Sequence, residues 1–406
     1  YEAMGSDNGY QFSDQPSPFL YIDNQTRLRE RWRMLGNAYI QIKPVKGLNI
    51  KSTFSPNFSY TRLGQFDGVM EEDDDFTTNK AQKTDTRAFD WTWDNIVNYN
   101  TTIAEKHAID LMGLASLTAS NSEKDYLLYS GVLDGTDWWN MASGTYNAEE
   151  SENSYSEKRM LSYALRANYS YASKYMLTGT IRWDGSSKFA DGYRWGSFPS
   201  IAAAWRISEE SWMKREWLSN LKLRVSYGMT GNFQIGNYTH LSTMDTDNYI
   251  LGSGNGSETS GYKPTGVENP DLTWEKTGMA NVGIDANFLN GYITLTAEYY
   301  NSMTTDMLLN VPIPHLTGYS TTLMNIGKVN NRGVELQIGS SHSYENGLGY
   351  SFNANFAKNI NEVKALGAND TPIISTGSVN HAYYITQVGS PIGSYYLMTV
   401  DGVFKN

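Results

Sequence analysis

Long stretches of the chain alternate between apolar and polar side chains with a period of two residues. The segment 47–60 shows this best, because amides, hydroxyls and a lysine separate its apolar positions, which are Leu48, Ile50, Phe54, Phe58 and Tyr60. Successive side chains of a strand point to opposite faces, so this segment is predicted to be a strand with one apolar and one polar side. It is longer than the ~5–6 residues of an ordinary strand in a soluble protein.

Segments of the same kind recur along most of the chain. The predicted strands cover residues 32–43, 47–60, 84–99, 103–119, 157–171, 174–184, 197–207, 220–231, 274–288, 291–304, 322–341 and 347–361. In 161–171, 174–184 and 220–231 the charged side chains fall on the polar face only. Charged groups are costly against lipid and well solvated in a hydrated lumen, so we expect an antiparallel wall with Leu48, Ile50, Tyr163, Leu177 and Leu223 toward lipid.

The connections between these segments provide a second, independent indication. Short turns alternate with long polar stretches, and the long ones are 61–83, 120–156, 185–196, 232–273, 305–321 and 362–390. Only 208–219 has an intermediate length. In an antiparallel wall every second connection emerges on the same side, as in outer-membrane barrels with short periplasmic turns and long external loops. A soluble β-sandwich has no reason to sort its loops in this way, so the alternation favours an all-β transmembrane antiparallel barrel.

Composition agrees with this fold class. The 406 residues show no shift in composition that would mark a domain boundary, so we expect 1–406 to belong to one barrel domain. Aromatic residues make up 13% of the chain, including 29 Tyr and 11 Trp, whose rings favour membrane interfaces. There is no Cys, so a disulfide framework and a thiolate metal site are excluded. The formal net charge of −11 argues against a nucleic-acid partner.

No catalytic constellation is found, and neither a cofactor nor a metal ion is predicted. The five histidines are scattered without metal-ligand spacing. The glycine-rich segment 252–256 is interpreted as a loop tip rather than a phosphate-binding loop. The acidic run 71–75 and the pair Asp245 and Asp247 offer oxygen ligands for calcium, but they lack the regular spacing of a calcium loop and suit a solvated external loop better.

Two groups of aromatic residues are candidate ligand-binding sites. Trp138, Trp139 and Tyr146 lie among carboxylates and amides in the long segment 120–156, and Tyr193 and Trp195 lie close to Asp184 and Gly185. Exposed rings beside polar groups suit sugar rings, and they suit peptides too. The alternative is that these rings pack their loops onto neighbouring structure, or that Trp195 belongs to an interfacial aromatic belt.

Other aromatic residues have a simpler interpretation. Phe89, Trp91 and Trp93 share one face of the segment 84–99, so they are predicted to form part of the lipid-facing wall. Trp212 and Trp217 flank the connection 208–219, where an anchoring role on the periplasmic side is expected.

Several segments resemble the SusC/RagA family of TonB-dependent outer-membrane transporters of Bacteroidetes. They are 165–169 with Lys174-Tyr175, Arg182-Trp183-Asp184-Gly185-Ser186-Ser187-Lys188-Phe189, 196–200, 204–210, 218–228 with Thr230-Gly231-Asn232, Asn269-Pro270-Asp271-Leu272-Thr273-Trp274-Glu275-Lys276, 330–336 and Asp401-Gly402-Val403-Phe404. The motifs follow the order of the family from about residue 160 to the end of the chain, with a weaker match before that.

The resemblance implies a bacterial outer-membrane location and import of an oligosaccharide or oligopeptide, driven through TonB. It also implies a SusD-like surface lipoprotein as a partner, and contact with outer-membrane lipid and lipopolysaccharide. Polar side chains of the wall would hydrate the lumen and contact a plug domain, and we expect this role for Lys51, Arg166, Arg182, Lys222, Arg224 and Asn281.

This chain departs from the family pattern in its length. No signal peptide, TonB box or plug domain is recognised, and about twelve predicted strands are too few for the 22-stranded barrel of such transporters. We therefore expect an internal portion of a longer polypeptide, without the plug and without the C-terminal strands of the barrel.

Other functions remain compatible with the sequence. A structural or adhesive barrel without transport would use the same wall, and a receptor for a siderophore or vitamin would share the TonB-dependent architecture. A secreted β-rich glycosidase would need a pair of carboxylates in a cleft, which one sequence cannot locate. By the resemblance, glycan and peptide importers share the barrel motifs and differ in their loops, so both substrate classes are kept.

Overall fold

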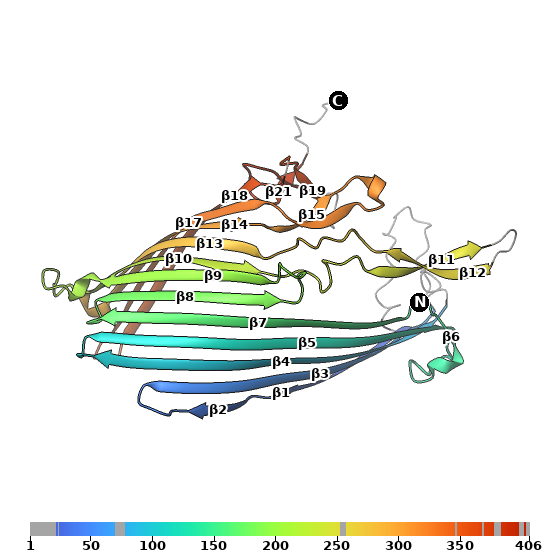
Figure 1. The fold of residues 1–406 in the computed structure, drawn as a ribbon, viewed down its shortest axis with the longest axis horizontal. Helices are drawn as coiled ribbons and strands as arrows, with labels where there is room; N and C mark the ends of the chain where they lie inside the picture. Colours follow the sequence, from blue (N-terminus) through green and yellow to red (C-terminus); the bar gives the residue numbers. More distant parts are fainter. Residues whose placement is uncertain are drawn as a thin grey trace. The chain divides into compact units, whose positions relative to one another are not determined.

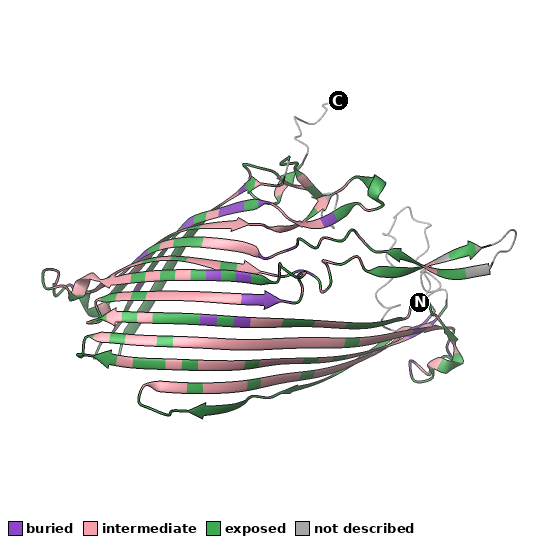
Figure 2. Ribbon diagram, in the orientation of Figure 1, coloured by how far each residue is buried: buried purple, intermediate pink, exposed green. Residues whose placement is uncertain are grey.

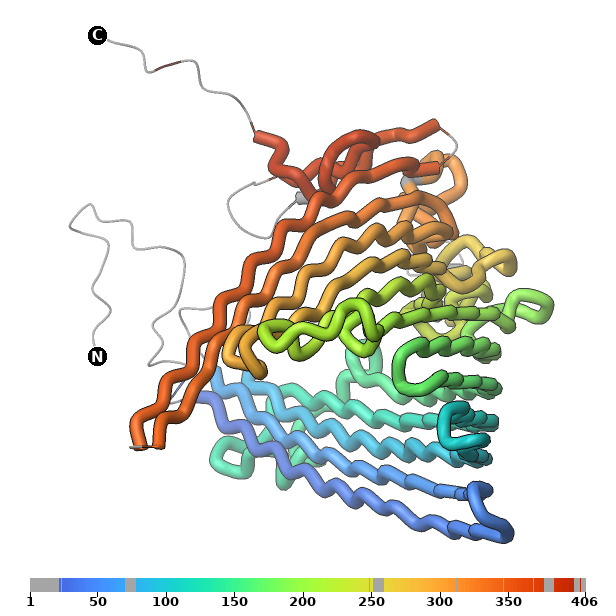
Figure 3. Tube along the Cα trace, turned by 90° about the vertical axis from the view of Figure 1, so that its left-hand side faces the viewer, coloured from blue at the N-terminus to red at the C-terminus, as the bar shows by residue number. Residues whose placement is uncertain are grey.

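The alternating segments pair as antiparallel strands, and each strand satisfies the backbone hydrogen-bonding groups of its neighbours. The computed structural model describes residues 22, 24–69, 78–251, 257–345, 347–367, 369–376, 383–397 and 402. Its main sheet has 14 strands, and their order along the sheet follows the order along the chain (Figures 1 and 3). No helix in the described part of the chain is long and apolar enough to cross a membrane.

The strands of the main sheet form a single path with two short additions. Along the path lie β1 (Gln25–Leu35), β3 (Leu48–Asp67), β4 (Lys80–Ile103), β5 (His107–Ser130), β7 (Glu152–Tyr171), β8 (Tyr175–Ser186), β9 (Trp195–Arg206), β10 (Leu218–Asn232), β13 (Glu275–Phe288), β14 (Ile293–Thr305), β17 (Lys328–Ser343) and β18 (Gly349–Ala365). Beside it, β2 (Ala38–Ile42) pairs with β3, and β6 (Thr145–Tyr146) pairs with β5.

Smaller sheets and single helical turns lie in the connections. The sheets are β11 (Met244–Leu251) with β12 (Ser257–Pro264), β15 (Leu308–Pro312) with β16 (Thr321–Asn325), and β19 (Ile373–Thr376) with β20 (Tyr383–Thr386) and β21 (Ser394–Tyr396). The 3₁₀ turns are η3 (Met141–Ser143), η4 (Ile207–Glu209), η5 (Leu289–Gly291) and η6 (His315–Thr317).

The all-β class is confirmed, whereas several strand boundaries are corrected. The strands β3, β4, β5 and β7 extend far into segments predicted as the loops 61–83 and 120–156. The segment 32–43 is two strands, β1 and β2, which both pair with β3. The break falls opposite Pro56, whose carbonyl accepts the Gly36 amide at 2.9 Å but which has no N–H to donate to the ladder. The segment 322–341 is also two strands, and its first part, β16, pairs with β15 instead of joining the main sheet.

The described chain divides into two compact units. Unit 1 comprises 1–38, 54–92 and 118–158, and unit 2 comprises 39–53, 93–117 and 159–406. The division cuts across β3, β4, β5 and β7, so each of these long strands contributes to both units. The two units are described separately below.

In unit 1 the side chains sort onto two faces. Phe54 and Trp91 mark the apolar face, where their ring centroids lie 5.8 Å apart. Asn57 and Asp90 mark the polar face, where the amide donates to the carboxylate at 2.9 Å. The alternation along the sequence therefore corresponds to one apolar and one polar face, as predicted.

Unit 2 shows the same division over more strands, because antiparallel partners share a face. One apolar row joins Leu223, Ile284, Ala297, Leu336 and Phe356 across β10, β13, β14, β17 and β18. Exposed and half-buried residues dominate the strands, and buried residues occupy only short stretches (Figure 2).

The five side chains expected toward lipid lie on apolar faces. Ile50, Tyr163 and Leu177 are 38%, 44% and 47% exposed, and Leu48 and Leu223 are half-buried on the same faces as their strand neighbours. Such exposure of large apolar groups along whole strands is not expected of a surface that faces water.

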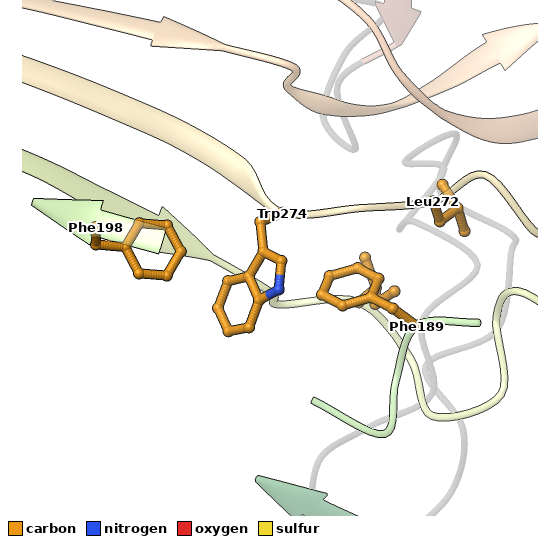
Figure 4. Close-up of a cluster of buried hydrophobic side chains, with 5 residues drawn as sticks. Phe189, Phe198, Leu272 and Trp274 are labelled. Carbon is orange, nitrogen blue, oxygen red and sulfur yellow. The ribbon is translucent and has the colours of Figure 1, made fainter. Parts of the chain in front are cut away.

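A small hydrophobic core lies where the long connections of unit 2 meet the strand ends. It contains Phe189, Phe198, Ile235, Leu272 and Trp274 (Figure 4). The Trp274 indole is 2% exposed, and its nitrogen donates to the Arg194 carbonyl at 2.9 Å. Three residues of the motif at 269–276 thereby have a structural role. Leu272 and Trp274 fill the core, and the Asn269 side chain donates to the Leu323 carbonyl at 2.8 Å.

The short connections contain tight turns with a left-handed backbone. Ala104 and Glu105 have φ of 48° and 56°, and Ala172 and Ser173 have 48° and 55°. Two successive positive φ values are typical of the turns that match the twist of a two-residue hairpin. They fix the register of the flanking strands without glycine.

An aromatic row on β8 and β9 ends at the connection after β9. Tyr175 and Trp205 stack with centroids 6.3 Å apart, and Trp205 contacts Trp212 edge-on at 6.4 Å. Glu210 accepts hydrogen bonds from the Tyr175 phenol, the Trp205 indole and the Lys174 ammonium at 2.6, 3.3 and 3.4 Å. These donors hold the pKa of the Glu210 carboxyl below its ordinary value.

Substitution of Glu210 by Gln is expected to reduce the acid sensitivity of the protein. The pKa of the carboxyl is depressed in the folded state, so its contribution to stability is present above the unfolded-state pKa of about 4.3 and is lost as the pH falls through the folded-state pKa. The thermal midpoint in detergent should fall less between pH 6 and pH 3 in Glu210→Gln than in the wild type. Glu209→Gln, at an exposed neighbour, is the control, and equal pH profiles for all three proteins would contradict this account.

Substitution of Gly231 by Ala is expected to destabilise the core around Trp274. A Cβ atom at this position would lie 2.2 Å from the Phe198 ring and 2.9 Å from Trp274. Such overpacking typically costs about 1–3 kcal/mol. Gly179→Ala is the matched control, since a Cβ there meets nothing within 4 Å. Heat-dependent mobility in SDS gels measures the effect, and the same unfolding temperature for both variants would show that Phe198 can move aside.

Candidate functional site

The polar face of unit 2 carries a cluster of charges that neutralise one another. Lys222 and Arg224 on β10 contact Asp285 on β13 at 3.1 and 2.8 Å, and Arg224 also contacts Glu298 on β14 at 3.3 Å. Asn281 donates a hydrogen bond to the same Glu298 carboxylate. Two cations and two anions thus form one connected network.

Strand register explains why these residues meet. Lys222 is paired with Asp285, and both Arg224 and Glu298 are paired with Gly283. A Cβ at Gly283 would lie 2.9 Å from an Arg224 guanidinium nitrogen. The glycine therefore leaves the space through which the arginine reaches Glu298.

The other expected lumen residues also lie on polar faces of their strands. Arg182 binds Asp184 at 2.8 Å, and the Arg166 guanidinium donates to the Thr180 hydroxyl at 3.3 Å. The Lys51 ammonium lies 4.4 Å from the centroid of the Tyr39 ring. The charged side chains named here on the polar faces thus each have a partner in the wall, which is a carboxylate, a hydroxyl or an aromatic ring.

Strand β1 in unit 1 is the exception. Arg27, Arg29, Arg31 and Arg33 occupy alternate positions, so all four lie on one face. Their partners on β3 are Gln65, Leu63, Thr61 and Ser59, which belong to the polar face. We call this row the arginine ladder; sequence reasoning missed it, although the two-residue period of Arg from 27 to 33 was a readable signal.

The candidate residues Trp138 and Trp139 lie on the other side of unit 1. Trp138 is only 6% exposed and packs with Ala81 and Val132. It also lies directly over Gly64, where a Cβ would be 2.2 Å from the indole. Gly64 and Ala81 are on the apolar face by strand parity, so the loop folds back onto that face. This is the packing alternative considered above for Trp138.

Trp139 and Tyr146 keep exposed rings. Trp139 is 63% exposed and contacts Trp138 in a tilted arrangement with ring centroids 5.5 Å apart, and the Arg62 guanidinium lies 5.2 Å from the centroid of the Trp139 ring. Tyr146 is 46% exposed and contacts the Tyr129 ring at 5.2 Å. Within unit 1, therefore, one of the three candidates is buried and two remain accessible.

Tyr193 and Trp195, in unit 2, point to different surroundings. Hydrogen bonding to the Asp271 carboxylate raises the pKa of the Tyr193 phenol, because the neutral phenol is the donor. Trp195 is 53% exposed and stacks on Tyr163 with centroids 6.1 Å apart. By the parity of β9 it shares a face with Ile201, which is the position of a belt residue.

The candidate oxygen-ligand sites do not converge on a metal site. Asp247 pairs with Lys263 at 3.3 Å, and the Asp245 carboxylate accepts from the Thr246 amide at 2.9 Å. The acidic run 71–75 and the glycine-rich segment 252–256 lie outside the described residues, as do most of 401–404. Within the described ranges, no three His, Asp or Glu side chains are grouped as metal ligands.

Comparison with known proteins agrees with this architecture. The family model of the TonB dependent receptor-like β-barrel matches residues 2–397. The chain belongs to the TonB-dependent receptor β-barrel family. It is accordingly an outer-membrane β-barrel chain of a receptor family, which is not a class of enzymes.

Curated relatives of the receptor include TonB-dependent receptor P39 of Formosa agariphila, 32% identical over 90% of this chain and 34% of the relative. TonB-dependent receptor SusC of Bacteroides thetaiotaomicron is 33% identical over 68% of this chain and 29% of SusC. The chain thus spans about a third of the length of the curated relatives it matches.

Solved structures show the same fold. The RagAB peptide transporter matches with a TM-score of 0.82 and 24% identity, covering 92% of this chain and 40% of that chain. The RagAB peptide importer in the "closed-closed" state matches with a TM-score of 0.81 and 25% identity, over 91% of this chain and 40% of that chain. The expected resemblance to SusC and RagA is confirmed.

Substitution of Gly64 by Ala is expected to release the loop that carries Trp138. The new methyl group would occupy the position of the indole, so Trp138 would have to leave its pocket against Ala81 and Val132. Limited proteolysis within 131–144 should become at least several times faster. Gly113→Ala, whose Cβ would have ordinary contact with Leu165 at 3.7 Å, is the control. Unchanged cleavage in Gly64→Ala would mean that the loop is held by its backbone hydrogen bonds instead.

Proposed function

We propose that the receptor imports an oligomeric nutrient, an oligosaccharide or an oligopeptide, across the bacterial outer membrane with energy supplied through TonB. The observation that carries this proposal is a sheet with an exposed apolar face and a charged polar face, in a chain that matches the family over residues 2–397. The similarity to SusC, and to a protein described as a peptide transporter, supports import of an oligomer.

In this proposal the described chain supplies the lumen wall and part of the outer rim. Charges such as Arg224 and Asp285 hydrate the lumen and offer a polar surface to a plug domain. Because they neutralise one another, they leave little net charge to trap a passing substrate. The long connections would face the outside of the cell, and the short turns would face the periplasm.

We propose a SusD-like surface lipoprotein as the partner, bound to the long connections. These connections carry folded elements, including the β11–β12 hairpin between β10 and β13. Ile250 and Tyr262 lie on the same face of that hairpin and are 75% and 68% exposed. Exposed aliphatic and aromatic side chains on a folded support suit the anchors of a protein interface.

A ligand-binding role for the five aromatic candidates remains a proposal, and the surroundings of each residue support it to a different extent. Trp139, Tyr146 and Tyr193 offer exposed rings next to polar groups, and these rings could stack on a sugar or a peptide side chain. Trp138 would act by holding Trp139 in place. Trp195 is better suited to an interfacial belt, since it shares its face with Ile201.

Deletion of the gene in its native host should abolish uptake of the nutrient oligomer. Labelled oligopeptides and oligosaccharides would be offered separately to wild-type, deletion and TonB-deficient cells. Loss of uptake of one class in both mutants is expected, because import needs the barrel and its energy source. Normal uptake of both classes, with loss of surface adhesion or of siderophore uptake instead, would contradict the proposal.

The double substitution Ile250→Asp/Tyr262→Asp should weaken co-purification of the lipoprotein at least tenfold in mild detergent. Two charges in place of apolar anchors would have to be desolvated at the interface. Thr259→Asp, at an exposed position on the opposite face of the hairpin, is the control. Equal recovery of the lipoprotein with both variants would place the partner elsewhere.

A further inference from the structure

The arginine ladder of β1 is a strongly charged surface that the neighbouring described strands do not neutralise. β1 is the first strand of the described path, and its ladder partner there is β3. All four side chains are exposed, and none forms an ion pair with a carboxylate of the described residues. Within the described ranges, Arg33 alone of the four has a hydrogen-bond partner, since its guanidinium donates to the Asn57 amide oxygen at 3.0 Å.

Nearby carboxylates on the same face are already engaged. Asp67 is 5% exposed and accepts hydrogen bonds from Gln65 at 3.1 Å and from Gln82 at 3.3 Å. Asp90 accepts from Asn57 at 2.9 Å. These amides satisfy the carboxylates on β3 and β4. The guanidinium groups therefore remain available to another anion, apart from the Nε–H that Arg33 donates to Asn57.

The opposite face of β1 has a different chemistry. Leu28, Trp32 and Met34 alternate with the arginines and are 45%, 70% and 69% exposed. The arginines therefore lie only on the face that also bears Asn57 and Asp90, so all four side chains extend from the same side of the strand. Residues 27–33 also include one carboxylate, Glu30, which lies on the opposite face and is paired across the strands with Arg62. In a chain with a net charge of −11, the four arginines on one face form a local exception.

The spacing of the ladder limits what can bind along it. Alternate residues of a strand repeat every ~6.6–6.8 Å, so the four Cα atoms span about 20 Å. An extended peptide with acidic residues at alternate positions repeats its carboxylates at the same interval. Each guanidinium can hold a carboxylate by two parallel hydrogen bonds, which gives directional as well as electrostatic recognition.

We propose that the arginine ladder is a binding track for an extended acidic oligopeptide. This inference rests on the proposed import function and narrows its substrate class. The peptide lies along the polar face of β1, and its alternate carboxylates engage Arg27, Arg29, Arg31 and Arg33 in turn. Mutual repulsion among the four cations is relieved when the peptide binds, so the site prefers a ligand with several anions to a single carboxylate.

The test uses the receptor expressed at its full encoded length and purified in detergent. The probe is a fluorescein-labelled peptide of five Glu-Ser repeats, and its neutral counterpart has five Gln-Ser repeats. The ladder variant is Arg29→Gln/Arg31→Gln. The control Lys83→Gln/Arg87→Gln removes the same charge from the apolar face of β4, where Lys83 and Arg87 pair with Asp85 and Glu123.

The wild type and the control should bind the Glu-Ser peptide at least tenfold more tightly than the Gln-Ser peptide. The ladder variant should lose at least tenfold in affinity for the Glu-Ser peptide alone. Raising the salt from 0.05 to 0.5 M should weaken the wild-type complex, because exposed charges are screened at high ionic strength. Unchanged heat-dependent gel mobility of the variants confirms that they are folded.

Equal affinity of the ladder variant and the wild type for the Glu-Ser peptide would overturn the inference. So would ladder-dependent binding of hexagalacturonate without binding of the peptide, since the anion would then come from a saccharide. Persisting TonB-dependent uptake of a neutral oligomer would show that the import function stands while the ladder has another role. Absence of TonB-dependent uptake of any oligomer would count against the import function itself.

Discussion

Pairing of backbone groups between neighbouring strands is the interaction on which the rest of this structure depends. The apolar face of this sheet is exposed, and in the described part of the chain it does not pack against a second layer of the protein. A hydrophobic core of the usual kind therefore cannot be what stabilises its strands. The ladder of hydrogen bonds fixes the register, and the register decides which side chains share a row. The apolar row through Leu223 and the charged cluster around Asp285 are consequences of the same pairing.

Charge is handled in two ways on the polar faces. In the Lys222, Arg224, Asp285 and Glu298 cluster each charge has an opposite partner on a neighbouring strand. Partly exposed pairs of this kind contribute only about 0–1 kcal/mol each, so their main effect is to keep a hydrated surface nearly neutral. The arginine ladder has no such compensation in the described wall, and this contrast separates a lining surface from a surface that attracts a ligand.

Sequence reasoning identified the strands with strict alternation, such as 174–184 and 220–231, because one face of each is apolar. It placed the ends of β3 and β5 too early, since residues 61–67 and 120–130 carry polar groups on both faces and no longer alternate with a period of two residues. The packing of Trp138 against Gly64 depends on residues 74 positions apart, a contact that no local pattern contains. The sequence also could not predict that Trp138 is buried and Trp139 exposed. Alternation between two faces applies to strands, and these residues lie in a loop.

The agreement between strand order and chain order has a consequence for how the sheet is assembled. Each strand along the path pairs with the strand that precedes it in the path, so the wall can grow by addition of one hairpin at a time. Short turns close the pairs β4–β5, β7–β8, β13–β14 and β17–β18, and the connection 233–274 between β10 and β13 is the longest. Closure entropy rises by only about 0.6 kcal/mol for each doubling of loop length, so this long excursion slows docking of β13 far less than its size suggests. Large insertions at the rim can thus diversify without disturbing the order in which the wall is built.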